Sequence, residues 1–141
     1  MDDALIAAAR RAQARAHAPY SRFKVGAALE ADDGRVFAGA NVENASYGLT
    51  NCAERVAVGA AVVAGARRFT RIVVVTDADP PAAPCGACRQ VLAEFGAGLV
   101  VEAVGPAGRR RWTLAELLPD AFGSRDLSGS AGAPVRRSDE P

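Results

Sequence analysis

The sequence predicts an α/β fold in which helices cover a mixed β-sheet within a single domain. A chain of 141 residues has room for one hydrophobic core. Half of its residues are hydrophobic and 23% are charged, which is ordinary for a globular protein. Apolar strand patterns alternate with Ala-rich helical patterns through the middle of the chain, and this alternation is typical of helices packed against a sheet.

The N-terminal part is expected to form a helix and then a β-hairpin. Residues 3–17 contain neither Gly nor Pro and are rich in Ala and Arg, so they predict a helix that Ala18-Pro19 ends. Two β patterns follow, over 24–31 and 36–42. Asp32-Asp33-Gly34-Arg35 separates them and is typical of a hairpin turn.

The middle of the chain predicts a second helix and a buried strand. Residues 52–64 are rich in Ala and Val, with Asn51 as the expected N-cap and Gly65 as the C-terminal cap. Residues 71–76 are β-branched and apolar on both faces, which is the pattern of a central strand with helices on either side.

The following residues predict two more helices and one more strand. A loop rich in Pro and Asp leads into a helix that begins near Cys85 and ends at Gly96. Residues 99–104 form another apolar strand pattern. Thr113-Leu-Ala-Glu116 is a capping box ahead of a short helix, and Pro119 stops that helix.

The folded domain is expected to cover residues 1–127. Residues 128–141 are rich in Ser, Gly, Pro and charged side chains, and they predict a disordered C-terminal tail. The chain contains no internal repeat.

The charge pattern argues against nucleic acid and membrane partners. The formal net charge is +1, so no overall field attracts nucleic acid or an anionic membrane. The longest strongly apolar run, residues 72–75, is too short to span a bilayer, and the N-terminus lacks a basic leader. We therefore expect a soluble cytoplasmic protein. We interpret two arginine-rich stretches as solvated faces: Arg67, Arg68 and Arg71, and Arg109 to Arg111.

The three cysteines form a pattern that indicates metal binding. Cys85 and Cys88 make a C-x-x-C, which in a chain without a secretion signal indicates a metal or redox site and not a disulfide framework. Both this pair and Cys52 fall at predicted helix N-termini, where unpaired N–H groups and the helix dipole favour thiolate. Two sulfurs from one helix start and a third from another can therefore meet at one zinc ion.

The number of ligands decides what such a zinc ion can do. Three protein ligands with one open position are typical of a catalytic zinc, whereas four ligands close a structural site. His17 is the remaining candidate for a fourth ligand, and its participation would make the site structural. Two further alternatives are a redox dithiol of Cys85 and Cys88, and buried cysteines without a metal.

Glu54 follows Cys52 by two residues, in the first turn of the same predicted helix. Its carboxylate can lie beside the metal without ligating it, where it can accept a proton from activated water. Water attack on an aromatic amidine carbon also needs a proton on the ring nitrogen and one on the departing ammonia. One carboxylate can perform these transfers. The alternative is that Glu54 only complements the helix dipole.

Together these motifs resemble the cytidine deaminase family, in particular its small homotetrameric members with three zinc-binding cysteines. Cys-x-Glu followed by Pro-Cys-x-x-Cys is similar to the signature of the zinc-dependent deaminases. The resemblance extends almost to Leu127. It rests on these segments: Tyr20-Ser-x-Phe23-x-Val25-Gly26-Ala27, Asn41-Val-Glu43-Asn44-Ala-Ser-Tyr47, Cys52-Ala-Glu54-Arg55, Pro84-Cys85-Gly86-Ala87-Cys88-Arg89-Gln90 and Leu117-Leu118-Pro119-x-x-Phe122.

The resemblance implies a three-layer α/β/α fold with a mixed central sheet, and a catalytic domain over residues 1–127. It implies one Zn²⁺ per chain, held by Cys52, Cys85 and Cys88, with Glu54 as the catalytic residue. Arg55 would lie against the thiolates and withdraw part of their excess negative charge.

The resemblance also implies the substrate contacts. Asn41 and Glu43 would hydrogen-bond the ribose, Phe23 would lie against the base, and backbone N–H groups around Ala53 would bind the pyrimidine carbonyl. The remaining contacts would cross subunit boundaries in a homotetramer, with Phe122 as a lid on a neighbour's pocket. Ala45 and Tyr47 of a neighbouring subunit would approach the 5′ end of the nucleoside.

These expectations lead to hydrolytic deamination of cytidine and 2′-deoxycytidine in pyrimidine salvage. Editing of a polynucleotide would use the same chemistry, but the chain lacks a basic groove. Deamination of a modified or antibiotic nucleoside, of the blasticidin type, is another alternative, and Asn41 and Glu43 fit ribose recognition better. A non-catalytic zinc module is the alternative outside enzymes, and the intact Glu54 argues against it.

Overall fold

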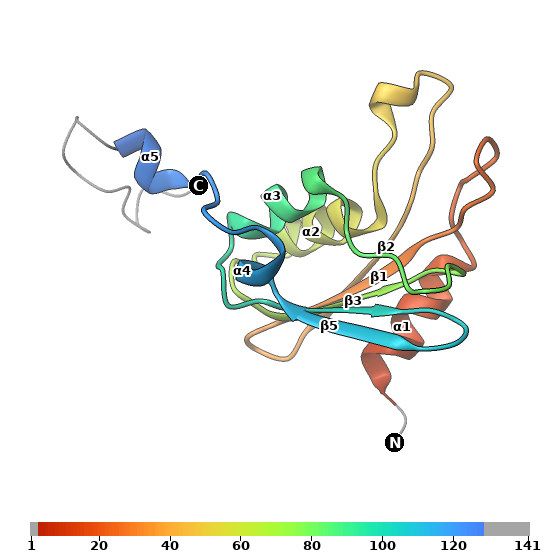
Figure 1. Cartoon of the computed structure of the whole chain (residues 1–141), viewed down its shortest axis with the longest axis horizontal. Coiled ribbons are helices and arrows are strands. Elements are labelled where there is room, and N and C mark those ends of the chain that lie inside the picture. Colours follow the sequence, from red (N-terminus) through yellow and green to blue (C-terminus); the bar gives the residue numbers. More distant parts are fainter. Residues whose placement is uncertain (1–2, 129–141) are drawn as a thin grey trace.

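The computed structural model describes residues 3–128 and is built around a five-stranded sheet in the order β2-β1-β3-β4-β5 (Figure 1). β3 and β4 are parallel, and the other neighbouring strands are antiparallel. The sheet is therefore mixed, as predicted. Its strands are β1 (Gly26–Ala31), β2 (Val36–Ala40), β3 (Phe69–Val75), β4 (Val100–Val104) and β5 (Arg109–Thr113).

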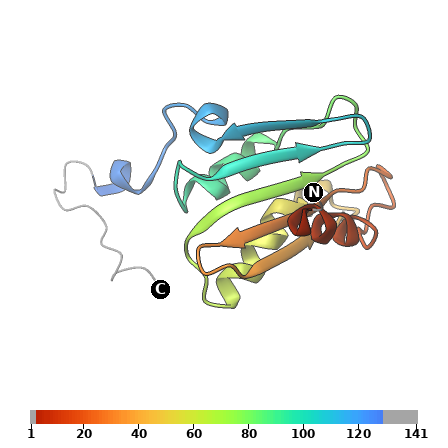
Figure 2. The same ribbon diagram turned by 90° about the horizontal axis from the view of Figure 1, so that it is seen from below.

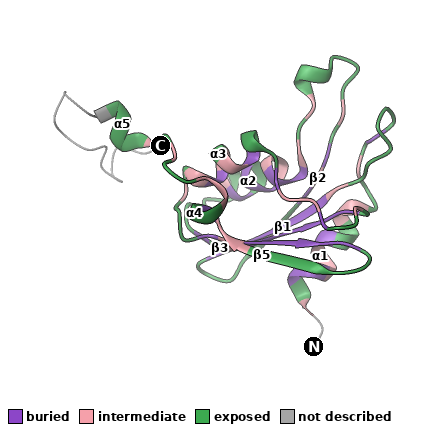
Figure 3. Ribbon diagram, in the orientation of Figure 1, coloured by how far each residue is buried: buried purple, intermediate pink, exposed green. Residues whose placement is uncertain are grey.

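Helices lie on both faces of this sheet and make three layers. On one face, Ala57 and Ala61 of α2 (Ala53–Val63) and Leu92 of α3 (Gly86–Ala93) pack in the same buried cluster as Ile72 and other strand residues. On the opposite face, α1 (Ala4–Gln13) lies across β1 and β3 (Figure 2). The burial pattern follows these layers: the central strands β1, β3 and β4 are mostly buried, whereas the edge strands β2 and β5 are largely exposed or half-buried (Figure 3). The predicted α/β/α fold class is thus the observed one.

The directions of the strands determine where the helices begin. β1 is antiparallel to both β2 and β3, so β2 and β3 run in the same direction, and β4 is parallel to β3. α2 follows β2 and α3 follows β3. Both helices therefore start at the same edge of the sheet, beyond the carboxyl ends of these strands. This is the edge at which α/β proteins bind their ligands.

The hairpin between β1 and β2 matches its prediction, whereas the first helix is shorter than expected. Gly34 has a φ of 89° in the hairpin turn, and the Ala31 N–H donates to the Arg35 carbonyl. α1 ends at Gln13 instead of residue 17. The reason lies in His17, whose backbone pairs with residues 41 and 43 as a short extended segment.

The predicted N-cap of α2 is wrong by one residue. Asn51 forms an antiparallel bridge with Val42, with N···O distances of 2.9 Å in both directions. Because Asn51 is engaged in that bridge, Cys52 becomes the N-cap of α2, and its side chain makes no capping hydrogen bond. Cys85 is likewise the N-cap of α3 without a capping bond from its side chain.

The C-terminal part contains a strand and a helix that the sequence pattern does not predict. Residues 109–113 form β5, an edge strand paired with β4, where we expected only a solvated arginine stretch. Arginines on an edge strand discourage pairing with other chains. The capping box of α4 (Leu114–Leu117) is present as predicted, and a further helix, α5 (Ser124–Ser128), follows. Residues 129–141 of the predicted tail lie outside the described residues.

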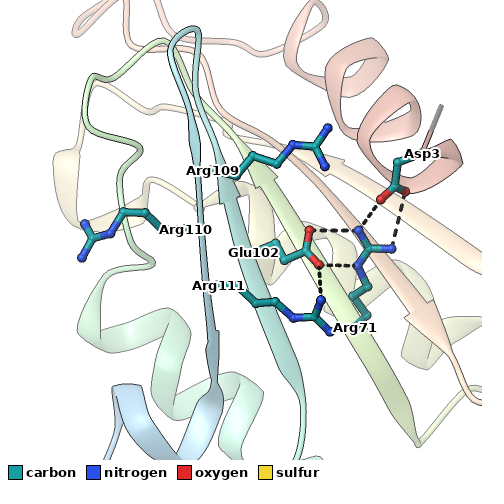
Figure 4. A pocket seen from close by; sticks show the side chains of 6 residues that line it. All are labelled: Asp3, Arg71, Glu102, Arg109, Arg110 and Arg111. Atoms are coloured by element: carbon teal, nitrogen blue, oxygen red, sulfur yellow. Dashed lines mark hydrogen bonds and ion pairs between the residues drawn. The ribbon is translucent and has the colours of Figure 1, made fainter. Parts of the chain in front are cut away.

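Arg71 is part of an ion-pair network and is not on a solvated face as predicted. Its guanidinium donates to both Glu102 carboxylate oxygens, at 3.0 and 2.9 Å, and also contacts Asp3 (Figure 4). Arg111 lies 3.7 Å from the same Glu102 carboxylate. The network ties the N-cap of α1 to β3, β4 and β5.

No described helix is long and apolar enough to cross a membrane.

Gly39 allows the first turn of α2 to lie directly on β2. A Cβ atom at this position would meet the Ala53 carbonyl oxygen at 2.4 Å and the Ala57 nitrogen at 2.5 Å. Both contacts are with backbone, so no side chain can move aside. Glycine at position 39 thus sets the height of α2 above the sheet.

We predict that Gly39→Ala lowers the free energy of unfolding by roughly 1–3 kcal/mol or more, because the added methyl overpacks this contact. Gly98→Ala is the matched control, since its Cβ would meet nothing within 4 Å, and it should change stability by less than about 1 kcal/mol. Urea unfolding at a fixed protein concentration measures both. Equal stability of the two variants would contradict the close approach of α2.

Candidate metal centre and active site

Two helix starts bring the three cysteines together. Cys52 precedes α2, Cys85 precedes α3, and Cys88 lies in the first turn of α3. Their sulfur atoms all lie within 4.8 Å of one another. Cys88 is buried, Cys52 is partly buried and Cys85 is exposed. The backbone N–H groups of both helix starts are left without capping side chains, and they favour negative charge at these sulfurs.

The spacing of the sulfurs fits a zinc ion. Two sulfurs that bind zinc at about 2.3 Å with tetrahedral angles lie about 3.8 Å apart. The Sγ atoms of Cys52 and Cys85 are 3.8 Å apart. Among the residues that the structure describes, no fourth His, Cys, Asp or Glu joins this group, and His17 is not part of it. The arrangement therefore offers three protein ligands to one Zn²⁺ and leaves a fourth position for water or substrate.

Arg55 contributes positive charge beside the thiols. Its Nη2 lies 3.3 Å from the Cys52 sulfur. A hydrogen bond from Cys88, and then the contact with Arg55, lower the pKa of Cys52 to about 5, although burial acts in the opposite direction. The Arg55 Nε is buried and has no hydrogen-bond partner in the described chain. This N–H is a donor that remains available to the negative charge of a zinc–thiolate cluster.

Glu54 is held beside the thiols in a nearly dry environment. It lies in the first turn of α2 and is only 4% exposed. Burial is the main cause that raises the pKa of Glu54 above its ordinary range, and the negative charge of Cys52 adds to the effect. A carboxylate with a raised pKa is suited to accept and return protons near neutral pH.

Asn41 is buried and braces the segment that carries Phe23. Its Oδ1 accepts a hydrogen bond from the Val25 N–H at 2.9 Å, and its Nδ2 donates to the Phe23 carbonyl at 2.8 Å. One N–H of the Asn41 amide remains for another acceptor. Asn41 is a polar residue at a strand end, where local structural roles are common, but its sequence position did not identify Phe23 and Val25 as the partners.

Glu43 has local partners of its own at the mouth of a hollow. It accepts hydrogen bonds from the N–H groups of Tyr20 and Ser21, at 2.9 and 3.2 Å, and from the Ser21 hydroxyl. The Ser21 hydroxyl bond is the main cause that holds the pKa of Glu43 below its ordinary range. Glu43, Tyr47 and neighbouring residues line a hollow of about 370 Å³. Nothing in the sequence distinguished Ser21 as the partner of Glu43.

The other residues predicted to contact substrate lie in different environments of the structure. Ala53 is fully buried at the start of α2, whereas Phe23, Tyr47 and Phe122 are all exposed. Ala45 and Tyr47 belong to a loop that extends away from the sheet and carries η1 (Tyr47–Leu49) near its tip (Figure 1). The segment before α5, which includes Phe122, lies on the other side of α2 and α3 in the same view. One chain therefore does not bring Tyr47 and Phe122 together.

Comparison with known proteins identifies a family that fits this geometry. Residues 1–104 match the model of the cytidine and deoxycytidylate deaminase zinc-binding region. A cytidine deaminase of Sporosarcina psychrophila is 49% identical over 129 residues, which cover 90% of this chain and 95% of that protein. A cytidine deaminase of Mycobacterium tuberculosis (strain H37Rv) is 50% identical over 120 residues, which cover 84% of this chain and 87% of that protein.

Solved structures agree in fold with this chain. The crystal structure of cytidine deaminase from Burkholderia pseudomallei superposes with a TM-score of 0.82 at 54% identity, covering 86% of this chain and 100% of that chain. The crystal structure of cytidine deaminase from Mycobacterium tuberculosis gives a TM-score of 0.75 at 48% identity, covering 85% and 95%. These similarities confirm the predicted fold class, and they agree with a zinc site at the cysteine cluster.

Proposed function

This chain belongs to the family of cytidine and deoxycytidylate deaminases, and from this premise we propose that it hydrolyses cytidine and 2′-deoxycytidine to the corresponding uridines, with release of ammonia. The observation that carries the proposal is the cluster of three thiols from two helix starts with the buried Glu54 beside it. Three thiol ligands leave a position for water, and the carboxylate supplies the proton transfers that hydrolysis of an amidine needs. We place this reaction in the salvage of pyrimidine nucleosides in the cytoplasm.

Glu54 moves the protons of the proposed reaction. Cys52, Cys85 and Cys88 would hold the zinc ion, which would lower the pKa of water and so supply the nucleophile. Glu54 accepts a proton from that water and delivers it to the ring nitrogen next to the carbon under attack. It then carries the second proton of the water to the amino group, which leaves as ammonia while the ring carbon keeps the oxygen. Burial of Glu54 supports this role because it raises the carboxyl pKa above its ordinary value, which favours proton return by the acid form.

Asn41, Glu43 and Phe23 are the proposed contacts to the nucleoside within one chain. The buried Asn41 has one amide N–H left after bracing the backbone of residues 23–25, and we assign it and Glu43 to the ribose hydroxyl groups. The same bracing positions Phe23, which we assign to the base. The backbone N–H groups around Ala53, at the start of α2, are assigned to the pyrimidine carbonyl.

The proposed active form is a homotetramer in which neighbouring chains complete each site. Tyr47 is 75% exposed and Phe122 is 58% exposed, although both are large aromatic residues. Within one chain, the loop that carries η1 and the segment before α5 lie on opposite sides of α2 and α3 (Figure 1). Both can therefore serve one pocket if they come from different chains. We assign Ala45 and Tyr47 to the 5′ end of a neighbour's nucleoside and Phe122 to the lid of a neighbour's pocket.

We predict that the purified protein deaminates cytidine and deoxycytidine but uses cytosine and CMP very poorly. Without the sugar, the remaining amide N–H of the buried Asn41 would lose its partner, and an unpaired buried polar group costs roughly 1–3 kcal/mol. A phosphate would find no Gly-rich cradle among the described residues near the cysteines. Absorbance-followed turnover of the four compounds measures this preference. Comparable rates with cytosine and cytidine would contradict sugar recognition, and no turnover of any of the four would overturn the proposed function.

We predict that Glu54→Gln retains zinc and the fold but loses turnover by about 10²–10⁴-fold or more, because glutamine cannot accept a proton. Metal analysis and circular dichroism on the same preparation serve as controls for zinc content and folding. Turnover within about tenfold of the unmodified chain would remove Glu54 from the mechanism, since that loss is below the range for a general acid–base group.

The shared site can be tested by mixing two impaired variants. Glu54→Gln and Phe122→Ala chains are unfolded, combined and reassembled with zinc. If Phe122 acts on a neighbour's pocket, some mixed tetramers contain a site with an intact Glu54 from one chain and an intact Phe122 from another. Activity then exceeds the sum of the two preparations reassembled separately. Absence of recovery, with mixed tetramers identified by native mass spectrometry, would place Phe122 in the structure of its own subunit.

A further inference from the structure

We propose that Arg89 and Gln90 are positioning residues that connect the zinc-ligand helix α3 to the segment carrying Phe122. The inference rests on the proposed function for its effect on substrate, but its effect on metal binding is independent of any substrate. The two residues are adjacent on α3, and each donates a side-chain hydrogen bond to a backbone carbonyl of the segment over residues 117–122. Neither residue is a metal ligand.

Arg89 holds two carbonyl groups that are distant in sequence. Its Nε donates to the Pro84 carbonyl and its Nη1 donates to the Leu117 carbonyl, each at 2.8 Å. Pro84 immediately precedes Cys85, so this bond fixes the peptide plane from which the Cys85 ligand starts. Leu117 is the last residue of α4, where a helix leaves carbonyl groups without intrahelical partners. One planar guanidinium thus ties the metal-ligand loop to the end of α4.

The side chain of Cys85 is less restrained by its surroundings than those of Cys52 and Cys88. Its side chain is exposed, whereas Cys88 is buried and held by packing in the core. Cys52 has Arg55 against its sulfur at 3.3 Å. For Cys85, the contact through the Pro84 carbonyl restrains the backbone instead. Groups that orient metal ligands from behind commonly contribute 10- to 100-fold to metal affinity, as order-of-magnitude values.

Gln90 contacts the segment that carries Phe122. Its Nε2 donates to the Phe122 carbonyl at 2.9 Å. Next to this bond, residues 118–125 and the end of α3 line a hollow of about 370 Å³. The segment is therefore incompletely packed on α3 at this point, and hydrogen bonds to its backbone set its position. Because this hydrogen bond is to the backbone of Phe122, replacing Gln90 removes a restraint on the segment without deleting the aromatic ring.

The two residues make separable contributions, which a set of four variants distinguishes. Arg89→Ala removes both the Pro84 and the Leu117 bonds, Arg89→Lys keeps the charge and can bond one carbonyl, and Gln90→Ala removes only the Phe122 bond. Arg10→Ala, at an exposed arginine of α1, is the matched control for loss of an arginine. Zinc affinity is measured on the full-length protein by competition with a chromophoric chelator. The absorption spectrum of the Co²⁺-substituted protein reports the geometry of the thiolate ligands.

We expect Arg89→Ala to weaken zinc binding about 10- to 100-fold and to shift the Co²⁺–thiolate bands, with partial recovery in Arg89→Lys. We expect Gln90→Ala to keep zinc affinity and the Co²⁺ spectrum while raising KM for cytidine about 3- to 10-fold at nearly unchanged kcat, as loss of one hydrogen bond would. Arg10→Ala should match the unmodified chain in every measurement.

Unchanged zinc affinity and Co²⁺ spectrum in Arg89→Ala would overturn the role of Arg89. An equal loss of zinc affinity in Gln90→Ala and Arg89→Ala would overturn the division between them, as would an unchanged KM in Gln90→Ala. If Arg89→Ala does not fold, Arg89→Lys with Gln90→Ala carries the same comparison. If the unmodified chain binds zinc but does not deaminate cytidine, the proposed function fails while the zinc measurements still decide the role of Arg89.

Discussion

Two helices that start at the same edge of the sheet create the site, and the rest of the structure depends on this convergence. β2, β3 and β4 run in one direction, so the helices that follow β2 and β3 both begin beyond their carboxyl ends. Cys52 and Cys85 are the N-caps of these helices, and Cys88 and Glu54 lie in their first turns. Gly39 keeps α2 close enough to the sheet for the two starts to meet.

The two helix starts also compensate part of the negative charge of a zinc ion bound by three thiolates. Three thiolates and one Zn²⁺ carry a net formal charge of −1, which opposes the acidification of bound water. Free N–H groups at the two helix starts and the Arg55 guanidinium supply compensating positive charge. The Arg55 Nε–H is buried and has no hydrogen-bond partner in the described chain. It is therefore a donor that can interact with the negatively charged thiolates. Burial of the Glu54 carboxyl, together with the negative charge of Cys52, keeps its pKa above the ordinary value.

Local patterns were sufficient to predict the fold class and the metal cluster, but contacts distant in sequence were not predictable. The C-x-x-C and the capping box act within one turn of chain, and both appear where expected. Asn51 has the composition of an N-cap, yet pairing with Val42 across nine positions moved the helix start to Cys52. The charges of Arg109 to Arg111 concealed β5, whose pairing with β4 is visible only in three dimensions. The substrate-site expectations for Asn41 and Glu43 named the residues but not the backbone groups that they brace.

The central claim is that three thiolates from two helix starts hold one zinc ion and leave one position open. Zinc K-edge X-ray absorption of the purified protein tests this claim most directly. We expect three sulfur scatterers at about 2.3 Å and one oxygen or nitrogen scatterer at about 2.0 Å, with no imidazole signal in the absence of substrate. Imidazole scattering, which would indicate that His17 closes the site, or fewer than three sulfur scatterers would contradict the account.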